Sequence, residues 1–80
     1  ADSPEVGFEH YNLGTLYYTE GHFEDAARMY EWALEYAPTH FQTMGQLADA
    51  CYWIPEQRGR AIELYTHAAE LAEGRQRLNV

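Results

Sequence analysis

The stretch Leu13–Ala33, LGTLYYTEGHFEDAARMYEWA, returns in altered form as Leu47–Ala68, LADACYWIPEQRGRAIELYTHA. Each copy opens with a leucine, and Leu13 aligns with Leu47, 34 residues later. Tyr30 recurs as Tyr65, which is 35 residues later. One residue is therefore inserted in the second copy, within 52–61, and insertions fall in loops. A period of about 34 residues is typical of antiparallel helical hairpins that stack on one another, so we expect an all-α fold.

Apolar and small residues at spacings of three and four predict four helices around these loops. The first three predicted helices span 5–20, 24–37 and 41–53. The fourth is expected to begin between Pro55 and Arg60 and to stop at Gly74, because glycine often ends a helix. Gly21 and Pro38 separate the earlier helices for the related reason that neither residue favours a helix interior.

The aromatic side chains divide into two groups by their place in the helical pattern. Those expected in the core are Tyr17, Tyr30 and Tyr65. Those that fit a surface groove or the core equally well are Tyr11, Tyr18, Tyr52 and Trp53. The single cysteine, Cys51, lies in an apolar helical pattern and is interpreted as a small buried side chain.

Composition limits the classes of partner. The chain has 80 residues and a formal net charge of -8, and all five of its basic residues are arginines. Such a surface repels phosphate groups, so we expect no binding to nucleic acid or to anionic membranes. No apolar run reaches the roughly 18 residues that span a bilayer. This favours a soluble segment, with the cytoplasm slightly favoured as its compartment.

The residues that could carry chemistry show no pattern of a reactive centre. The four histidines are His10, His22, His40 and His67, and no two of them have the i, i+4 spacing of a helical zinc site. No nucleophile lies beside a base, and no glycine-rich loop follows a strand. We therefore expect no enzymatic activity, no cofactor and no metal ion.

The first hairpin resembles the tetratricopeptide repeat, whose motif it matches at several fixed offsets. The matching residues are His10-x2-Leu13-Gly14-x2-Tyr17, Ala26-x3-Tyr30, Ala33 and Pro38. It departs from the motif at His10, where tryptophan is usual, and at Tyr30, where phenylalanine is usual.

The second hairpin departs further from the same motif. Ala48 stands in place of the glycine, Cys51 in place of the tyrosine and Glu73 in place of the closing proline. Its Pro55-x5-Ala61-Ile62-x2-Tyr65-x2-Ala68-Ala69 is similar to the longer-turn, SEL-type relatives of the superfamily. The resemblance implies one domain, 1–80, with repeats at about 7–40 and 41–74 and a C-terminal tail at 75–80.

The resemblance implies a right-handed stack whose first helices line a concave groove that binds a partner peptide or protein segment. The groove residues by this analogy are Phe8, Tyr11, Asn12, Thr15, Tyr18, Thr19, Gln42, Gln46, Asp49, Tyr52 and Trp53. This set contains no lysine or arginine, so it lacks the basic clamp with which some relatives hold acidic tails. We expect the partner to be neutral or basic.

A structural role is the alternative interpretation. Repeat arrays usually need about three units for stability, and this chain has two. The hairpins would then stack on further repeats of a longer helical array, or on a second copy in a homo-oligomer, and the apparent groove residues would be buried.

Overall fold

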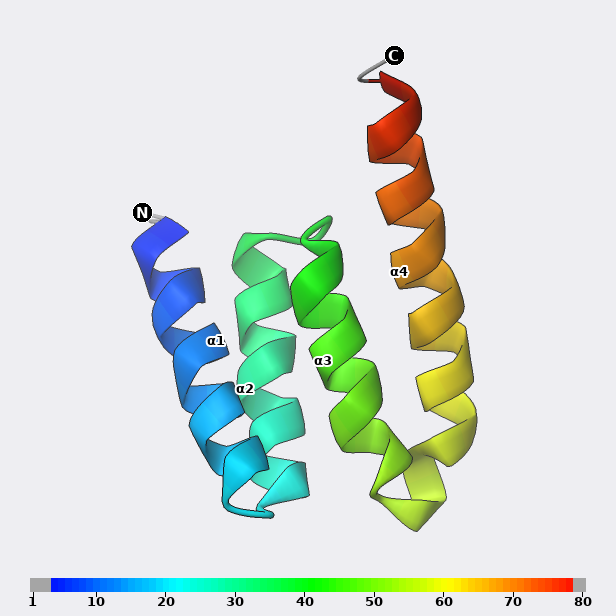
Figure 1. Ribbon diagram of the computed structural model, residues 1–80. Helices are drawn as coiled ribbons and strands as arrows, with labels where there is room; N and C mark the ends of the chain where they lie inside the picture. Colours follow the sequence, from blue (N-terminus) through cyan, green and yellow to red (C-terminus); the bar gives the residue numbers. More distant parts are fainter. Residues whose placement is uncertain (1–3, 79–80) are drawn as a thin grey trace.

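The computed structural model describes residues 4–78 as four α-helices and one short 3-10 helix, with no strand in that range (Figure 1). The elements are α1 (Pro4–Thr19), α2 (Phe23–Tyr36), α3 (Phe41–Tyr52), η1 (Pro55–Gln57) and α4 (Arg58–Leu78). The predicted all-α stack of hairpins is confirmed. The 3-10 helix occupies the segment that carries the inserted residue, because the longer turn begins with Pro55, which cannot extend α3.

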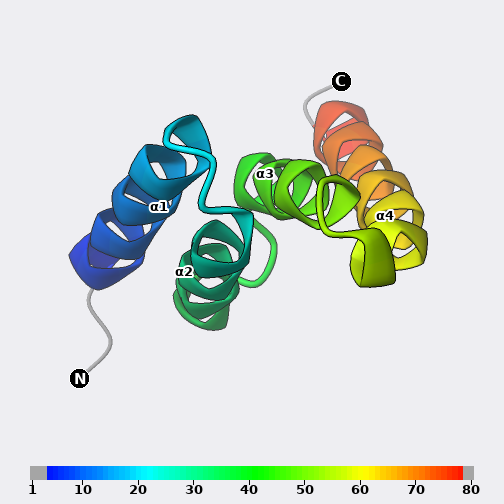
Figure 2. The same cartoon turned by 90° about the horizontal axis from the view of Figure 1, so that it is seen from below.

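Each helix packs against the next one in the chain, and α1 also touches α3. Seen end-on, α1 and α3 lie on the same side of α2, and α4 lies beyond α3 (Figure 2). The first hairpin is therefore α1 with α2, and the second is α3 with α4. The α2–α3 junction joins the two hairpins.

Small residues let the helices of this junction approach closely. The central cluster is Ala26, Ala27, Tyr30, Leu47, Ala48, Ala50, Cys51, Ile54 and Ala61. Tyr30 is completely buried, and a Cβ atom added to Gly14 would lie 2.8 Å from its ring. Glycine at that position is what allows α1 to approach Tyr30, which explains the glycine of the sequence motif.

The turn between α1 and α2 depends on Gly21, whose φ of 83° is the one positive value within the described chain. The His22 N–H donates to the Tyr17 carbonyl at 2.9 Å, and the Gly21 N–H donates to the Tyr18 carbonyl at 3.0 Å. This pair of bonds is a Schellman motif, which satisfies the last carbonyl groups of α1.

The predicted helix stop at Gly74 is wrong, because α4 continues through it to Leu78. A glycine ends a helix by adopting a positive φ, and Gly74 does not do so. Of the predicted tail, 75–78 continues α4 and 79–80 lies outside the described residues. Within residues 4–78, no helix combines the length and hydropathy needed to traverse a lipid bilayer.

Candidate functional site

In each hairpin, a tyrosine hydroxyl of the second helix forms a hydrogen bond with a side chain of the first helix. The Tyr30 hydroxyl lies 3.0 Å from Thr15 Oγ1, and the Tyr65 hydroxyl donates to Asp49 Oδ1. The two pairs occupy equivalent positions, since Thr15 aligns with Asp49 in the repeat just as Leu13 aligns with Leu47. Each tyrosine thus ties the second helix of its hairpin to a predicted groove residue on the first helix. Thr15 and Asp49, both predicted groove residues, therefore already have a hydrogen-bond partner within their own hairpin.

Burial favours the neutral form of both phenols. Burial raises the pKa of Tyr30, although its bond to Thr15 acts in the opposite direction. Burial is also the largest cause that raises the pKa of Tyr65, followed by its hydrogen bond to the Asp49 carboxylate. A carboxylate accepts from a phenol but repels a phenolate, so Tyr65 acts as a hydrogen-bond donor.

Four aromatic rings form a continuous row across the end of the molecule where α1 and α3 finish. We call this row, Tyr18, Phe23, Trp53 and Tyr52, the aromatic strip. Neighbouring ring centroids lie 5.3 Å apart for Tyr18 and Phe23, 5.8 Å for Phe23 and Trp53, and 5.4 Å for Trp53 and Tyr52. Trp53 Nε1 also donates to the Tyr18 hydroxyl at 3.0 Å, which joins the two hairpins. The rings therefore support one another in a fixed arrangement.

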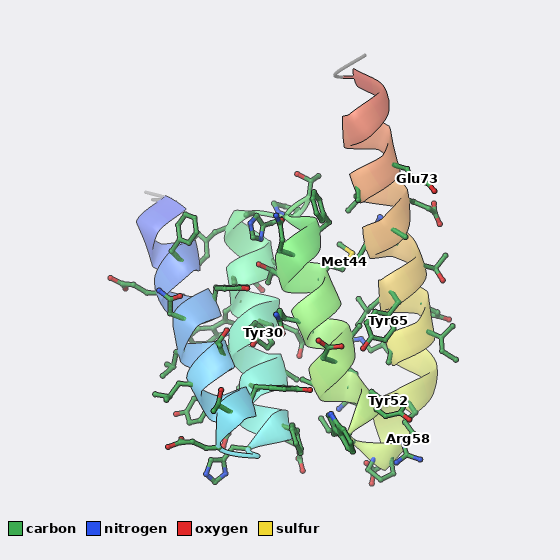
Figure 3. All side chains as sticks on the ribbon, viewed as in Figure 1. Tyr30, Met44, Tyr52, Arg58, Tyr65 and Glu73 are labelled. Atoms are coloured by element: carbon green, nitrogen blue, oxygen red, sulfur yellow. The ribbon has the colours of Figure 1, made fainter. Side chains whose placement is uncertain are left out.

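The strip ends on a cation and is open to solvent. Figure 3 shows Tyr52 and Arg58 beside each other where α3 gives way to α4. The Arg58 guanidinium carbon lies 5.4 Å from the Tyr52 ring centroid, and Arg58 Nε donates to the Tyr52 carbonyl at 3.0 Å. Tyr52 is 50% exposed and Trp53 is 51% exposed. Both residues are thus accessible from solvent.

Carboxylates border the strip. A hollow of about 500 Å³ lies between the α1–α2 turn and the segment after α3, lined by Phe23, Trp53, Ile54 and Pro55. The charged residues of its rim are Glu24, Asp25, Arg28 and Glu56. The Arg28 guanidinium lies 3.6 Å from the Asp25 carboxylate and compensates its charge. Glu24 and Glu56 have no such counterpart among the charged residues of the rim, so the rim carries a net negative charge.

Phe8 and Tyr11 lie together in a second group around His40. Their rings meet the imidazole edge-on, with centroids 6.4 Å and 6.1 Å from it. A hollow of about 100 Å³ opens there, lined by Gly7, Phe8, Tyr11, Ala33, Tyr36, Ala37, His40 and Thr43. His40 is held in turn by Thr43, whose N–H donates to His40 Nδ1 at 3.3 Å. This end of the surface is predominantly aromatic and aliphatic.

The predicted groove residues therefore fall into separate groups. Tyr18, Tyr52 and Trp53 belong to the aromatic strip, and Phe8 and Tyr11 belong to the group around His40. The Thr19 hydroxyl donates to the Thr15 carbonyl at 2.8 Å. The remaining predicted residues are Asn12 and Gln42, which are exposed, and Gln46, which is half-buried.

Two of the three tyrosines expected in the core lie at least partly inside the fold. Tyr30 is completely buried and Tyr17 is half-buried. The prediction for Tyr65 is wrong, because its side chain is 42% exposed. The reason is that α3 covers Tyr30, whereas no helix of the described chain covers the corresponding face of α4.

Sequence reasoning missed three contributors to this surface, namely Phe23, His40 and Arg58. The spacing of His40 and Thr43, three residues apart at a helix start, is a capping pattern and could have indicated one of them. Phe23 and Arg58 offered no such signal, because their contacts to Trp53 and Tyr52 form only after the chain has turned. Over the described chain, no group of three His, Cys, Asp or Glu side chains is placed to hold a metal ion.

Comparison with known proteins places the first hairpin in a family. The family model of the tetratricopeptide repeat matches residues 7–40, which span α1, α2 and the turn to α3. No curated protein matches the chain. The family match confirms the resemblance that the motif residues of the first hairpin predict.

Proposed function

Since residues 7–40 form a tetratricopeptide repeat, a module of protein–protein interaction, we propose that this chain binds a partner segment across α1 and α3. The observation that carries the proposal is the aromatic strip. Two of its rings, Tyr52 and Trp53, are half-exposed, yet hydrogen bonding and ring contacts already hold them in place. A preformed aromatic surface binds with little loss of side-chain entropy, which is why tyrosine and tryptophan are frequent anchors of protein interfaces.

The charge around the strip favours a neutral or basic partner. The carboxylates of the neighbouring rim and the net charge of -8 attract cations and repel acidic segments. Arg58 on the Tyr52 ring is an internal example of a guanidinium held by this surface. An arginine of a partner would stack on the exposed face of Trp53 in the same manner.

The rest of the proposed groove extends from the strip toward Phe8. Asn12, Thr19, Gln42 and Gln46 would supply polar contacts along it, as the sequence predicts. The hollow beside Phe8 and Tyr11 would take a small apolar side chain of the same partner segment. The family supports such a scaffold role over catalysis, because its repeats are in general non-catalytic.

Peptide titration tests this function. The probes are an arginine-rich peptide, a glutamine analogue of the same length and a glutamate-rich analogue, measured at two salt concentrations. Trp53 fluorescence reports binding in a Trp32→Phe background, because the other tryptophan is itself 49% exposed. We expect the arginine-rich peptide to bind most tightly, and we expect its affinity to fall at high salt. Binding of no probe, or equal binding of the acidic one, would contradict the proposal.

Two variants locate the binding surface. Tyr18→Ala combined with Tyr52→Ala should weaken binding by about 1 kcal/mol or more, roughly fivefold in Kd. Asp49→Asn should weaken binding of the arginine-rich peptide more than binding of the glutamine analogue. The substitution removes the negative charge and keeps an acceptor for the Tyr65 hydroxyl. Ile62→Ala is the matched control, an exposed apolar residue on α4 away from the strip, and it should bind as the parent does.

A further inference from the structure

Residues at equivalent positions on the second helices of the two hairpins differ in their exposure to solvent. On α2, Ala27 is 3% exposed and Tyr30 is 0% exposed. Their counterparts in the second repeat, on α4, are Ile62, which is 69% exposed, and Tyr65, which is 42% exposed. The difference arises because α3, the first helix of the next repeat, packs on α2, whereas within the described chain no helix of a further repeat packs on α4. We call this surface the α4 face.

Residues at equivalent positions on the first helices, α1 and α3, also differ in exposure, and here the exposed ones belong to the first hairpin. On α3, Leu47 is 1% exposed and Ala50 is 0% exposed, since α2 precedes them. Their counterparts in the first repeat, on α1, are Leu13, which is 39% exposed, and Leu16, which is 54% exposed. We call this surface the α1 face. The α1 face and the α4 face lie on the outermost helices of the row (Figure 2).

Charge also matches across the two faces. Within the α2–α3 junction, Phe23 and Ile54 line the same hollow. With the inserted residue placed between Ile54 and Arg58, their counterparts are Arg58, beside the α4 face, and Glu20, beside the α1 face. This placement agrees with the contacts, since Arg58 lies on the Tyr52 ring as Phe23 lies against the Tyr18 ring. A second junction of the same geometry would therefore set a carboxylate opposite a guanidinium where the first one has two apolar residues.

We propose that the α1 face of one copy of this chain docks on the α4 face of a second copy, repeating the α2–α3 junction between molecules. Leu13 and Leu16 then cover Ile62 and Tyr65, and Glu20 pairs with Arg58. The contact is head to tail, so it joins successive copies into open chains rather than closed dimers. None of these six residues belongs to the aromatic strip, in contrast to the alternative expected from the sequence, in which the groove residues themselves are buried.

The net charge of -8 on every copy opposes this contact through long-range repulsion. Salt screens that repulsion, whereas the short-range apolar contact persists. Self-association should therefore strengthen with salt, while binding of a basic peptide to the aromatic strip should weaken. The opposite salt dependences make failure of this inference distinguishable from failure of the proposed binding function.

Sedimentation velocity of the whole chain measures the association. We expect the average mass to rise past that of a dimer as concentration approaches about 1 mM, a range that reaches weak interfaces. The rise should be larger at about 1 M NaCl than at about 0.1 M. A monomer throughout both series, or a closed dimer whose mass does not increase further, overturns the proposal.

Complementary variants test which faces meet. Leu16→Asp blocks the α1 face and Ile62→Asp blocks the α4 face, and each variant alone should associate at least about tenfold more weakly than the parent. An equimolar mixture retains one intact face of each kind, so it should form a dimer that grows no further. If either variant associates like the parent, or the mixture stays monomeric, the head-to-tail contact is wrong. Should an aspartate variant lose helix by circular dichroism, Leu16→Ser and Ile62→Ser replace the pair.

Charge reversal tests the register of the contact. Glu20→Arg and Arg58→Glu should each weaken association, and the chain that carries both should recover it, because the pair is restored with opposite polarity. A purely structural effect of either substitution would not be reversed by the other. Failure of the double variant to exceed both single variants would overturn the proposed register.

Discussion

At the scale of single residues, the most informative feature is the tyrosine that both repeats carry at one position, Tyr30 and Tyr65. Phenylalanine is usual in the motif at the position of Tyr30, and each tyrosine hydroxyl reaches a residue of the facing helix, Thr15 or Asp49. The hydroxyl of a buried tyrosine such as Tyr30 needs a partner, and both hairpins supply one from the same position of the repeat. Each hydroxyl thereby links the second helix of its hairpin to a side chain of the first helix.

Removal of these hydroxyls should destabilise the protein modestly. Tyr30→Phe and Tyr65→Phe are each expected to lower the free energy of unfolding by about 0.5–1.5 kcal/mol, the usual contribution of one hydrogen bond. Urea unfolding of both variants measures this. A double-mutant cycle of Tyr65→Phe with Asp49→Ala should show coupling of the same sign, and additivity in that cycle would mean that the bond contributes nothing.

Alkaline pH should destabilise the fold through the same tyrosines. The pKa of both Tyr30 and Tyr65 is raised from the ordinary value of 10.0, so the unfolded chain loses these protons first. The stabilisation is complete below pH 10 and is lost as pH rises through the higher folded values. Solvent screening reduces the contribution of Tyr65 to this stabilisation, because its side chain is 42% exposed. Burial also raises the pKa of the Cys51 thiol from 9.0, which adds to the loss.

Thermal melts from about pH 8 to 11 measure this loss. The variant that carries both Tyr30→Phe and Tyr65→Phe should lose less stability over that range than the parent does. An equal decline in parent and variant would assign the effect to other groups.

At the scale of elements, the starts of α2 and α3 differ although a histidine precedes each one. His40 accepts a hydrogen bond from the Thr43 N–H, and its Nδ1 also lies 2.6 Å from the Thr43 hydroxyl. His22 makes no side-chain cap bond, and α2 relies on Glu24 and Asp25 in its first turn to complement the helix dipole. The start of α3 therefore depends on one side chain, and that side chain also borders the hollow beside Phe8 and Tyr11.

Replacing the two histidines separately tests this difference. His40→Ala should lower the free energy of unfolding by about 0.5–2 kcal/mol, as loss of a helix cap commonly does. His22→Ala is the matched control and should stay within about 0.5 kcal/mol of the parent. The measurement is thermal unfolding followed by circular dichroism. Equal losses in the two variants would show that the bond to Thr43 does not stabilise α3.

At the scale of the whole molecule, we expect the α2–α3 junction to contribute most to stability, because both hairpins contribute to one buried cluster there. The outer helices are packed on one side only, and α4 projects past the turn between α2 and α3 (Figure 1). In a repeat stack each unit is stabilised by its neighbours, so residues at the junction matter more than their counterparts at the ends.

Leu13 and Leu47 provide a matched comparison, since both are leucines at the same position of the repeat. Leu47→Ala should lower the free energy of unfolding by about 2–5 kcal/mol, because it opens a cavity at a buried site. Leu13→Ala, at a site that is 39% exposed, should lower it by less than about 1 kcal/mol. Urea unfolding at low protein concentration keeps self-association out of the comparison. Similar losses at both sites would contradict the junction as the centre of stability.

The sequence by itself determined the four helices, their hairpin pairing and the turn that carries the inserted residue. These features follow from local signals: the spacing of apolar residues, the small residues Ala26 and Ala61, and the breaks at Gly21 and Pro38. Local signals failed at Gly74, because a glycine can stay helical where no backbone turn is required. They also failed at Tyr65, because its burial depends on a neighbouring helix rather than on its own repeat.

Only the tertiary structure decided which predicted groove residues meet. Tyr18, Phe23, Trp53 and Tyr52 come from three segments of the chain and form the aromatic strip only when the hairpins are packed. The engagement of Thr15 and Asp49 by the two tyrosines depends likewise on the helix that folds back over them. The physical reason is that periodicity records which face of a helix is apolar, whereas exposure and contacts depend on what the rest of the fold places against that face.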